Sequence, residues 1–179
     1  MRRLSLTNKK VRGIARRLRS LHKWSDSFAG WFPDELNPTD RYCNWKLPVL
    51  SGLVEGKQAK QPVQAECAQR LINACAHLMA AKPQWANPFR VTCSITLPDM
   101  FSSEVCIYMD EDYYQGHVRE GAYEYGTTTR IQDKSLAQEW GLALPSGVNE
   151  LGVFLNYSSA EDSWSLQGER WFFGEVTNG

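Results

Sequence analysis

Three carboxylates and one imidazole lie within eight residues near the middle of the chain: Asp110, Glu111, Asp112 and His117. Side chains of these types bind divalent metal ions or exchange protons with a substrate. The spacing does not fit an EF-hand, because a calcium loop numbered from Asp110 requires Gly at its sixth position and Glu at its twelfth. Gln115 and Gly121 occupy those positions. We interpret the stretch as an exposed acidic loop, and we predict no metal and no cofactor.

No other stretch of the sequence has a catalytic signature. His22 and His77 are the remaining histidines, and both fall within predicted helices. The chain has no nucleophile elbow, no glycine-rich phosphate loop and no Cys-X-X-Cys pair. One alternative stays open, since active sites assemble from residues that are distant in sequence. It is a hydrolase-like enzyme with a carboxylate and histidine site, built from Glu104, Asp110, Asp112 and His117.

The acidic stretch is also rich in tyrosine, with five acids and four tyrosines between residues 110 and 125. An acidic face accelerates the encounter with a basic partner, and tyrosines buried by that partner slow its dissociation. The segment is therefore predicted to bind a protein. The predicted contact residues are Asp110, Glu111, Asp112, Tyr113, Tyr114, Glu120, Tyr123, Glu124 and Tyr125.

The most basic stretch is KKVRGIARRLRSLHKW, residues 9–24. Residues 1–24 contain nine Lys or Arg and no acid, although the formal net charge of the whole chain is zero. Apolar residues recur at helical spacing from Val11 to Phe28, which predicts an amphipathic helix over about 8–30. We interpret its basic side chains as a solvated face. Nucleic-acid binding through this helix is a further alternative, disfavoured because the remaining chain is acidic.

Hydrophobic periodicity predicts the elements that position these residues. Apolar residues at helical spacing predict a helix over 62–81, with Pro62 in its first turn. Strict alternation predicts a strand over 89–97 with one face in the core and the other in water. Shorter strands are predicted at 42–49, 104–109, 127–132, 151–157 and 170–176, with a bulge at Gly168. A short helix is predicted at 135–141, with Ser135 as its N-cap and Gly141 beyond its end.

This order of elements predicts an α+β fold with a mainly antiparallel sheet of about five to six strands and two longer amphipathic helices. We expect a single domain over 1–179, with the sheet formed mainly by residues 89–176 and the helices on one of its faces. The five cysteines show neither zinc-ligand nor disulfide spacing, which is typical of a reducing cytoplasm. No secretory signal and no membrane span is expected.

Several short motifs resemble an uncharacterised bacterial family that is catalogued as a domain of unknown function. They are KKVRGIARR, NWKLPV, LPDMFSSEV, EWGLALP and RWFFGEV, and the resemblance covers about residues 9–176. It implies a bacterial cytoplasmic protein of one domain, and it carries no active site. Together with the acidic, tyrosine-rich stretch, it favours a non-catalytic protein-binding module, specifically an immunity protein that neutralises a toxin.

Overall fold

The computed structural model describes Arg19 and residues 36–46, 61–97, 100, 103–119, 127–131, 133–157 and 168–176. The helix predicted over 8–30 lies outside this part of the chain, apart from Arg19. The elements in chain order are β1 (Tyr42–Lys46), α3 (Gln61–Ala80), β2 (Arg90–Leu97), β3 (Glu104–Tyr108), α4 (Glu111–Tyr114), the π-helical turn η2 (Gln115–Arg119), β4 (Thr127–Ile131), α5 (Leu136–Trp140), β5 (Asn149–Tyr157) and β6 (Gly168–Gly174).

The strands form one sheet in the order β1-β3-β2-β6-β5-β4, and every neighbouring pair is antiparallel. The strands predicted over 89–97 and 104–109 are β2 and β3, and they pair in antiparallel fashion with Val91 opposite Ile107. The predicted α+β class with an antiparallel sheet is therefore confirmed. β2 and β6 lie at its centre.

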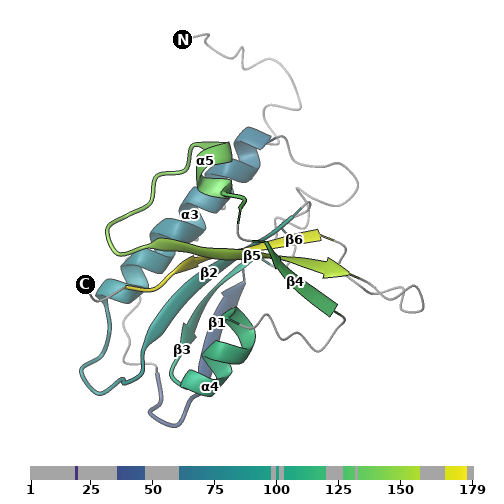
Figure 1. Cartoon of the computed structure of the whole chain (residues 1–179). Coiled ribbons are helices and arrows are strands. Elements are labelled where there is room, and N and C mark those ends of the chain that lie inside the picture. Colours follow the sequence, from purple (N-terminus) through teal and green to yellow (C-terminus); the bar gives the residue numbers. More distant parts are fainter. Residues whose placement is uncertain are drawn as a thin grey trace.

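The helix α3 covers one face of this sheet (Figure 1). Its fully buried residues include Leu71, Cys75 and Leu78, whose spacing places them on one side of the helix. They pack against the β2 side chains Cys93 and Ile95, which are both 0% exposed. The short helix α5 contributes to the same core, so α3 and α5 form one layer.

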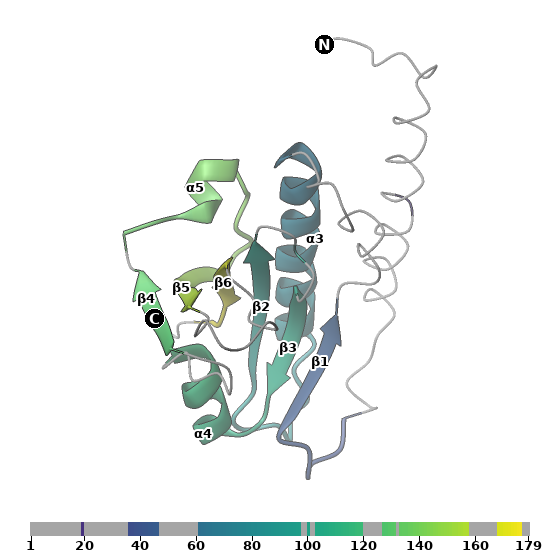
Figure 2. The same cartoon turned by 90° about the vertical axis from the view of Figure 1, so that its right-hand side faces the viewer.

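The prediction that helices cover only one face is wrong. α4 and η2 lie on the opposite side of the sheet from α3 (Figure 2). Tyr114 of α4 and Val118 of η2 pack there against Tyr108, Phe154 and Phe172. With this second layer, much of the sheet is covered on both of its faces.

The prediction that one face of β2 is wet is also wrong. Thr92, Ser94 and Thr96 lie on the face away from α3, and each is at most 2% exposed. Their polarity suggested contact with water, but Ser94 accepts a hydrogen bond from Arg170 at 2.8 Å instead. Alternation of polar and apolar residues marks the two faces correctly, yet a face with small polar side chains can still be buried by a second layer.

The boundaries of α5 follow from local capping, as predicted. The Ser135 hydroxyl accepts a hydrogen bond from the backbone N–H of Gln138, and Gly141 ends the helix with φ of 64°. The bulge predicted at Gly168 falls at the edge of the described residues, where Gly168 begins β6 opposite Asn156. A register irregularity between β5 and β6 lies between Glu150 and Gly152.

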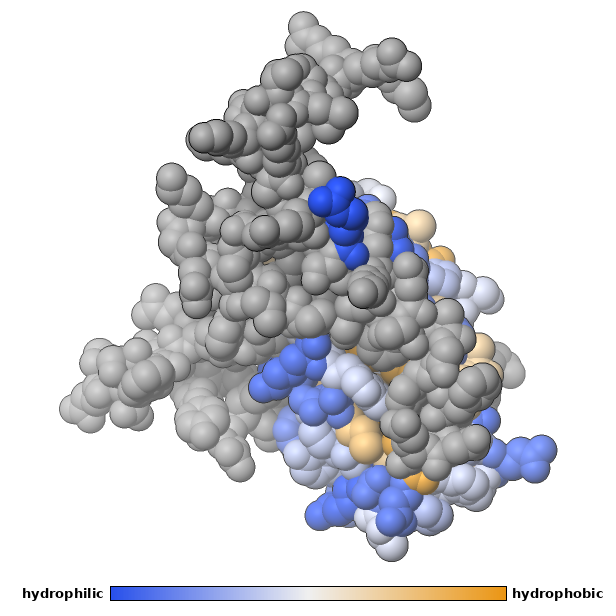
Figure 3. Space-filling model, turned by 180° about the vertical axis from the view of Figure 1, so that it is seen from behind, coloured by the Kyte–Doolittle hydropathy of each residue, from blue (hydrophilic) through white to orange (hydrophobic). Residues whose placement is uncertain are grey.

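The surface seen from behind is mainly hydrophilic where residues are described, with hydrophobic side chains visible in small patches (Figure 3). No helix in the described part of the chain is long and apolar enough to cross a membrane. All five cysteines are free. Burial raises the pKa of the Cys67 thiol to about 12, which makes it a core side chain and a poor nucleophile.

Candidate functional site

The helix α4 begins directly after β3 because Asp110 caps it. The Asp110 carboxylate accepts a hydrogen bond from the backbone N–H of Tyr113 at 2.8 Å. Its other oxygen accepts from Arg41 Nε at 2.9 Å. The Arg41 side chain, followed by the Tyr113 N–H, lowers the pKa of Asp110. The first acid of the predicted binding segment is thus paired within the protein and fixes the start of the helix.

The second acid, Glu111, is paired as well. Its two oxygens accept hydrogen bonds from Arg90 Nε at 2.9 Å and Arg90 Nη2 at 3.2 Å, which is the bidentate geometry typical of Arg. Gln115 donates a further hydrogen bond at 2.6 Å. Arg90 and then Gln115 lower the pKa of Glu111. Asp112 differs, because it is exposed and forms no ion pair with the described residues.

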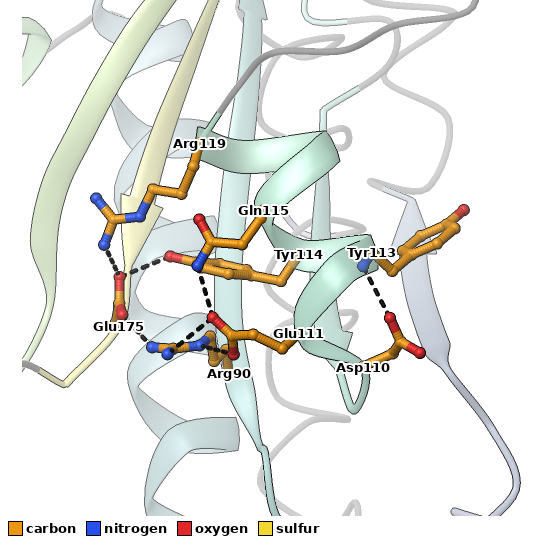
Figure 4. A network of polar contacts seen from close by, with 8 residues as sticks. All are labelled: Arg90, Asp110, Glu111, Tyr113, Tyr114, Gln115, Arg119 and Glu175. Carbon is orange, nitrogen blue, oxygen red and sulfur yellow. Dashed lines mark hydrogen bonds and ion pairs between the residues drawn. The ribbon is translucent and has the colours of Figure 1, made fainter.

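Glu175, directly after β6, joins α4 to the sheet (Figure 4). One carboxylate oxygen is paired with Arg90 Nη1. The other accepts hydrogen bonds from the Tyr114 hydroxyl at 2.6 Å and from Arg119 Nη2 at 2.5 Å. Arg90 therefore lies between two carboxylates, Glu111 and Glu175, and its guanidinium lies 4.8 Å from the centre of the Tyr114 ring. A buried carboxylate held by three donors is tied to one orientation.

Tyr114 does not belong to the accessible surface, which corrects its place among the predicted contact residues. Its side chain is 0% exposed and belongs to the core between α4 and the sheet. Burial and then the bond to Glu175 raise its pKa above the ordinary range of a tyrosine. Tyr114 therefore holds α4 in place and is unavailable to a partner.

The backbone at the end of β6 has two positive φ angles, which residues with a side chain rarely adopt. Gly174 has φ of 142°, and a Cβ at this position would lie 2.2 Å from the carbonyl oxygen of Val91. Glu175 follows with φ of 66°, which is uncommon for a residue other than Gly. Such conformations persist where the surroundings hold them, and here three donors hold the Glu175 side chain.

A cavity of about 320 Å³ is lined in part by Arg90 and Glu175. The end of α3, the loop that follows it and the start of β2 form most of its wall. Its lining residues are Met79, Lys82, Asn87, Pro88, Phe89, Arg90, Val91, Glu175 and Val176. This wall combines apolar side chains with charged and polar groups, and the polar groups contribute more of its surface.

A second cluster, formed by Tyr42, Tyr113 and His117, lies between β1 and α4. The rings of Tyr113 and His117 stack with centroids 4.3 Å apart, and the ring of Tyr42 lies 5.3 Å from that of Tyr113. The Arg41 guanidinium lies 5.7 Å from the centre of the Tyr113 ring. All three rings are half-buried, and Arg41 is exposed. We call these four residues the aromatic patch.

The family of the chain follows from a comparison with protein-family models. The model described as "Protein of unknown function (DUF3916)" matches residues 22–175. The chain belongs to the DUF3916 family. Searches of curated proteins and of solved structures find no match. The family covers the sheet, α3 and α4, so both the aromatic patch and most of the cavity lie within it.

The four residues considered for an enzymatic site in this DUF3916 chain do not form one centre. Asp110 is bound to Arg41, whereas Glu104 lies at the opposite end of β3, about 13 Å along the strand at the usual rise per residue. Glu104 accepts hydrogen bonds there from Arg170 at 2.5 Å and Asn44 at 2.6 Å. Within the described residues, no three His, Cys, Asp or Glu side chains are placed to hold a metal ion.

The remaining predicted contact residues, Glu120, Tyr123, Glu124 and Tyr125, lie outside the described residues. Three members of the observed network were missed from the sequence: Arg90, Arg119 and Glu175. Arg90 lies on the supposedly wet face of β2, and Glu175 is 64 residues beyond Glu111. No spacing signal connects them, because the contacts form only when β2, β6 and α4 pack together.

Proposed function

We propose that this protein is a non-catalytic protein-binding module and that the aromatic patch, with Asp112, is its contact surface. The observation that carries the proposal is the stacking of Tyr42, Tyr113 and His117 beside the exposed Arg41. Tyrosine and arginine, together with tryptophan, are enriched at the energetic centres of protein interfaces. Here they are arranged on the surface before any partner binds.

The local structure supports the proposal because it reduces the entropy cost of binding. The backbone of Tyr113 is held by the Asp110 cap, and its ring is held between Arg41 and His117. A side chain that is already ordered loses little rotamer freedom when a partner covers it. The aromatic patch is therefore a rigid anchor, as the predicted contact surface requires.

The charges support a narrower role for the acids than the sequence indicated. Asp110 is paired with Arg41 and Glu111 with Arg90, so each negative charge is largely neutralised by a neighbouring positive charge. Asp112 remains the exposed acid of α4 without an ion pair to the described residues. We expect Asp112 to steer a basic partner, and Tyr113 to slow its release.

The specific form of the proposal is an immunity protein of the bacterial cytoplasm that neutralises a toxin. Its support is the combination of the bacterial resemblance, the absence of a catalytic signature in the sequence, and a rigid aromatic surface beside an acid. The test uses the product of a toxin-like reading frame next to this gene. Co-expression in a bacterial host should rescue growth, and the two purified proteins should bind.

The residue-level test measures binding kinetics for matched variants. Tyr113→Ala should raise the dissociation rate by about 30-fold, the equivalent of about 2 kcal/mol. Asp112→Asn should lower the association rate about two- to threefold at low salt, and this effect should vanish at high salt. Leu144→Ala and Asp133→Asn, both exposed and in the segments that flank α5, serve as controls.

Two results would contradict different parts of the proposal. If no adjacent toxin-like product binds or is neutralised, the immunity form is wrong. If a partner binds and Tyr113→Ala leaves the dissociation rate unchanged, the contact surface lies elsewhere.

A further inference from the structure

We propose that the cavity beside Arg90 and Glu175 binds a small organic carboxylate with an apolar body. This inference is independent of the protein-binding proposal, because the cavity lining contains no residue of the aromatic patch. Its volume of about 320 Å³ lies at the lower end of the usual range for ligand sites, so the ligand is a small molecule.

The charge of the ligand follows from the polar groups on the wall. Glu175 lines the cavity, but its two oxygens already accept hydrogen bonds from Arg90, Tyr114 and Arg119. A cationic ligand would compete with two guanidinium groups for this carboxylate. It would also approach Lys82, which forms no ion pair with the described residues. The cavity therefore disfavours a cation.

An anion finds unused donors on the same wall. A guanidinium has five N–H donors, and the Arg90 bonds to Glu111 and Glu175 use one on each nitrogen. One N–H on each terminal nitrogen is left for a ligand. The Arg90 side chain is 31% exposed and lines the cavity, so it is not sealed from a ligand. Together with the Lys82 ammonium, these N–H groups match a carboxylate.

The apolar part of the ligand follows from the remaining wall. Met79, Pro88, Phe89 and Val176 line the cavity, and Val176 is 53% exposed. Few large apolar side chains in the described surface are this exposed. Covering them with a hydrocarbon body removes apolar surface from water, which inorganic anions cannot do.

The experiment compares four probes by amide chemical-shift titration of the full-length protein. The probes are 3-phenylpropionate, its neutral amide, 3-phenylpropylamine and inorganic phosphate. We expect 3-phenylpropionate to bind and to shift the amide signals of Val91, Glu175 and Val176. The neutral amide should bind about tenfold more weakly, because it loses the charged contacts with Lys82 and Arg90. The amine and phosphate should bind more weakly still.

A matched pair of variants tests the position of the carboxylate. Lys82→Met should weaken binding of 3-phenylpropionate about three- to fivefold, the usual range for one partly exposed ion pair. Lys46→Met should change nothing, since Lys46 is exposed at the far end of β1, opposite Glu104. Circular dichroism confirms that both variants are folded.

The proposal is overturned if 3-phenylpropionate shifts none of the three amides at millimolar concentration. It is also overturned if the neutral amide or phosphate binds as tightly as the carboxylate, or if Lys82→Met and Lys46→Met behave alike.

Discussion

The two faces of the sheet are built on different physical principles. The face toward α3 is apolar, with Cys93, Ile95 and Phe173 buried against the helix. The face toward α4 combines aromatic rings with buried polar side chains, among them Ser94 and Glu104. The same strands contribute to both faces, so the difference comes from alternate residues of β2, β3 and β6.

The two faces therefore differ in the substitutions that they tolerate. Apolar contacts on the α3 face tolerate exchange among side chains of similar volume. The polar face depends on definite partners, because a buried polar group without one is costly. The hydroxyls of Thr92 and Thr96 form no hydrogen bond with any residue that the structure describes. On the α3 face, the indole N–H of Trp171 is in the same situation. Of the two proposed sites, the aromatic patch borders α4, whereas the cavity lies at the end of α3.

The largest effect is expected where the polar face buries a charge pair. The side chains of Arg170 and Glu104 are 13% and 10% exposed and lie 2.5 Å apart. Glu104→Leu should lower the free energy of unfolding by about 3–5 kcal/mol, because it leaves the guanidinium without its carboxylate. Adding Arg170→Met should restore much of the loss, since an apolar pair carries no buried charge. Urea unfolding measures both.

A double variant that is no more stable than Glu104→Leu alone would contradict this account. It would show that Arg170 contributes through packing, for example against Phe172, whose ring centre lies 5.4 Å from the guanidinium.

A somewhat smaller effect is expected on the apolar face. Leu71→Ala should lower the free energy of unfolding by about 2–5 kcal/mol, because Leu71 is 0% exposed and its loss leaves a cavity. Asn73→Ala, on the exposed side of the same helix, should change it by less than about 0.5 kcal/mol. Conservative Leu71→Met should cost less than about 1.5 kcal/mol. Equal losses for Leu71→Ala and Asn73→Ala would show that α3 does not carry the core.

The contrast between the faces also explains what the sequence could predict. α3, β2 and the capped helix α5 depend on local periodicity and capping, so their positions followed from residues near one another in the chain. The alternation in β2 separated its two faces correctly. It could not show that the second face is buried, because the cover comes from α4 and from Arg170 of β6.

The candidate site was predictable only in part for the same reason. The acids of α4 stood out by composition, but their roles depend on Arg41 and Arg90, which are 69 and 21 residues away. The burial of Tyr114 likewise depends on packing against other strands. Composition can identify a segment with unusual chemistry, whereas the division into surface and core residues requires the fold.

The smallest expected effect is a weakening of the α4 contacts in acid. Arg41 and Arg90 lower the pKa values of Asp110 and Glu111, so these groups stabilise the folded state while they are ionised. The stabilisation is complete above their ordinary pKa values, about 4, and it is lost as pH falls through the lowered values. Amide hydrogen exchange at Tyr113 should therefore accelerate below about pH 4, while Cys93 and Ile95 on the α3 face stay protected.

Arg41→Gln should raise the pKa of Asp110 and leave that of Glu111 unchanged, as read from the carboxyl carbon signals. Titration of Asp110 at its ordinary pKa in the parent protein would show that the bond to Arg41 does not persist in solution.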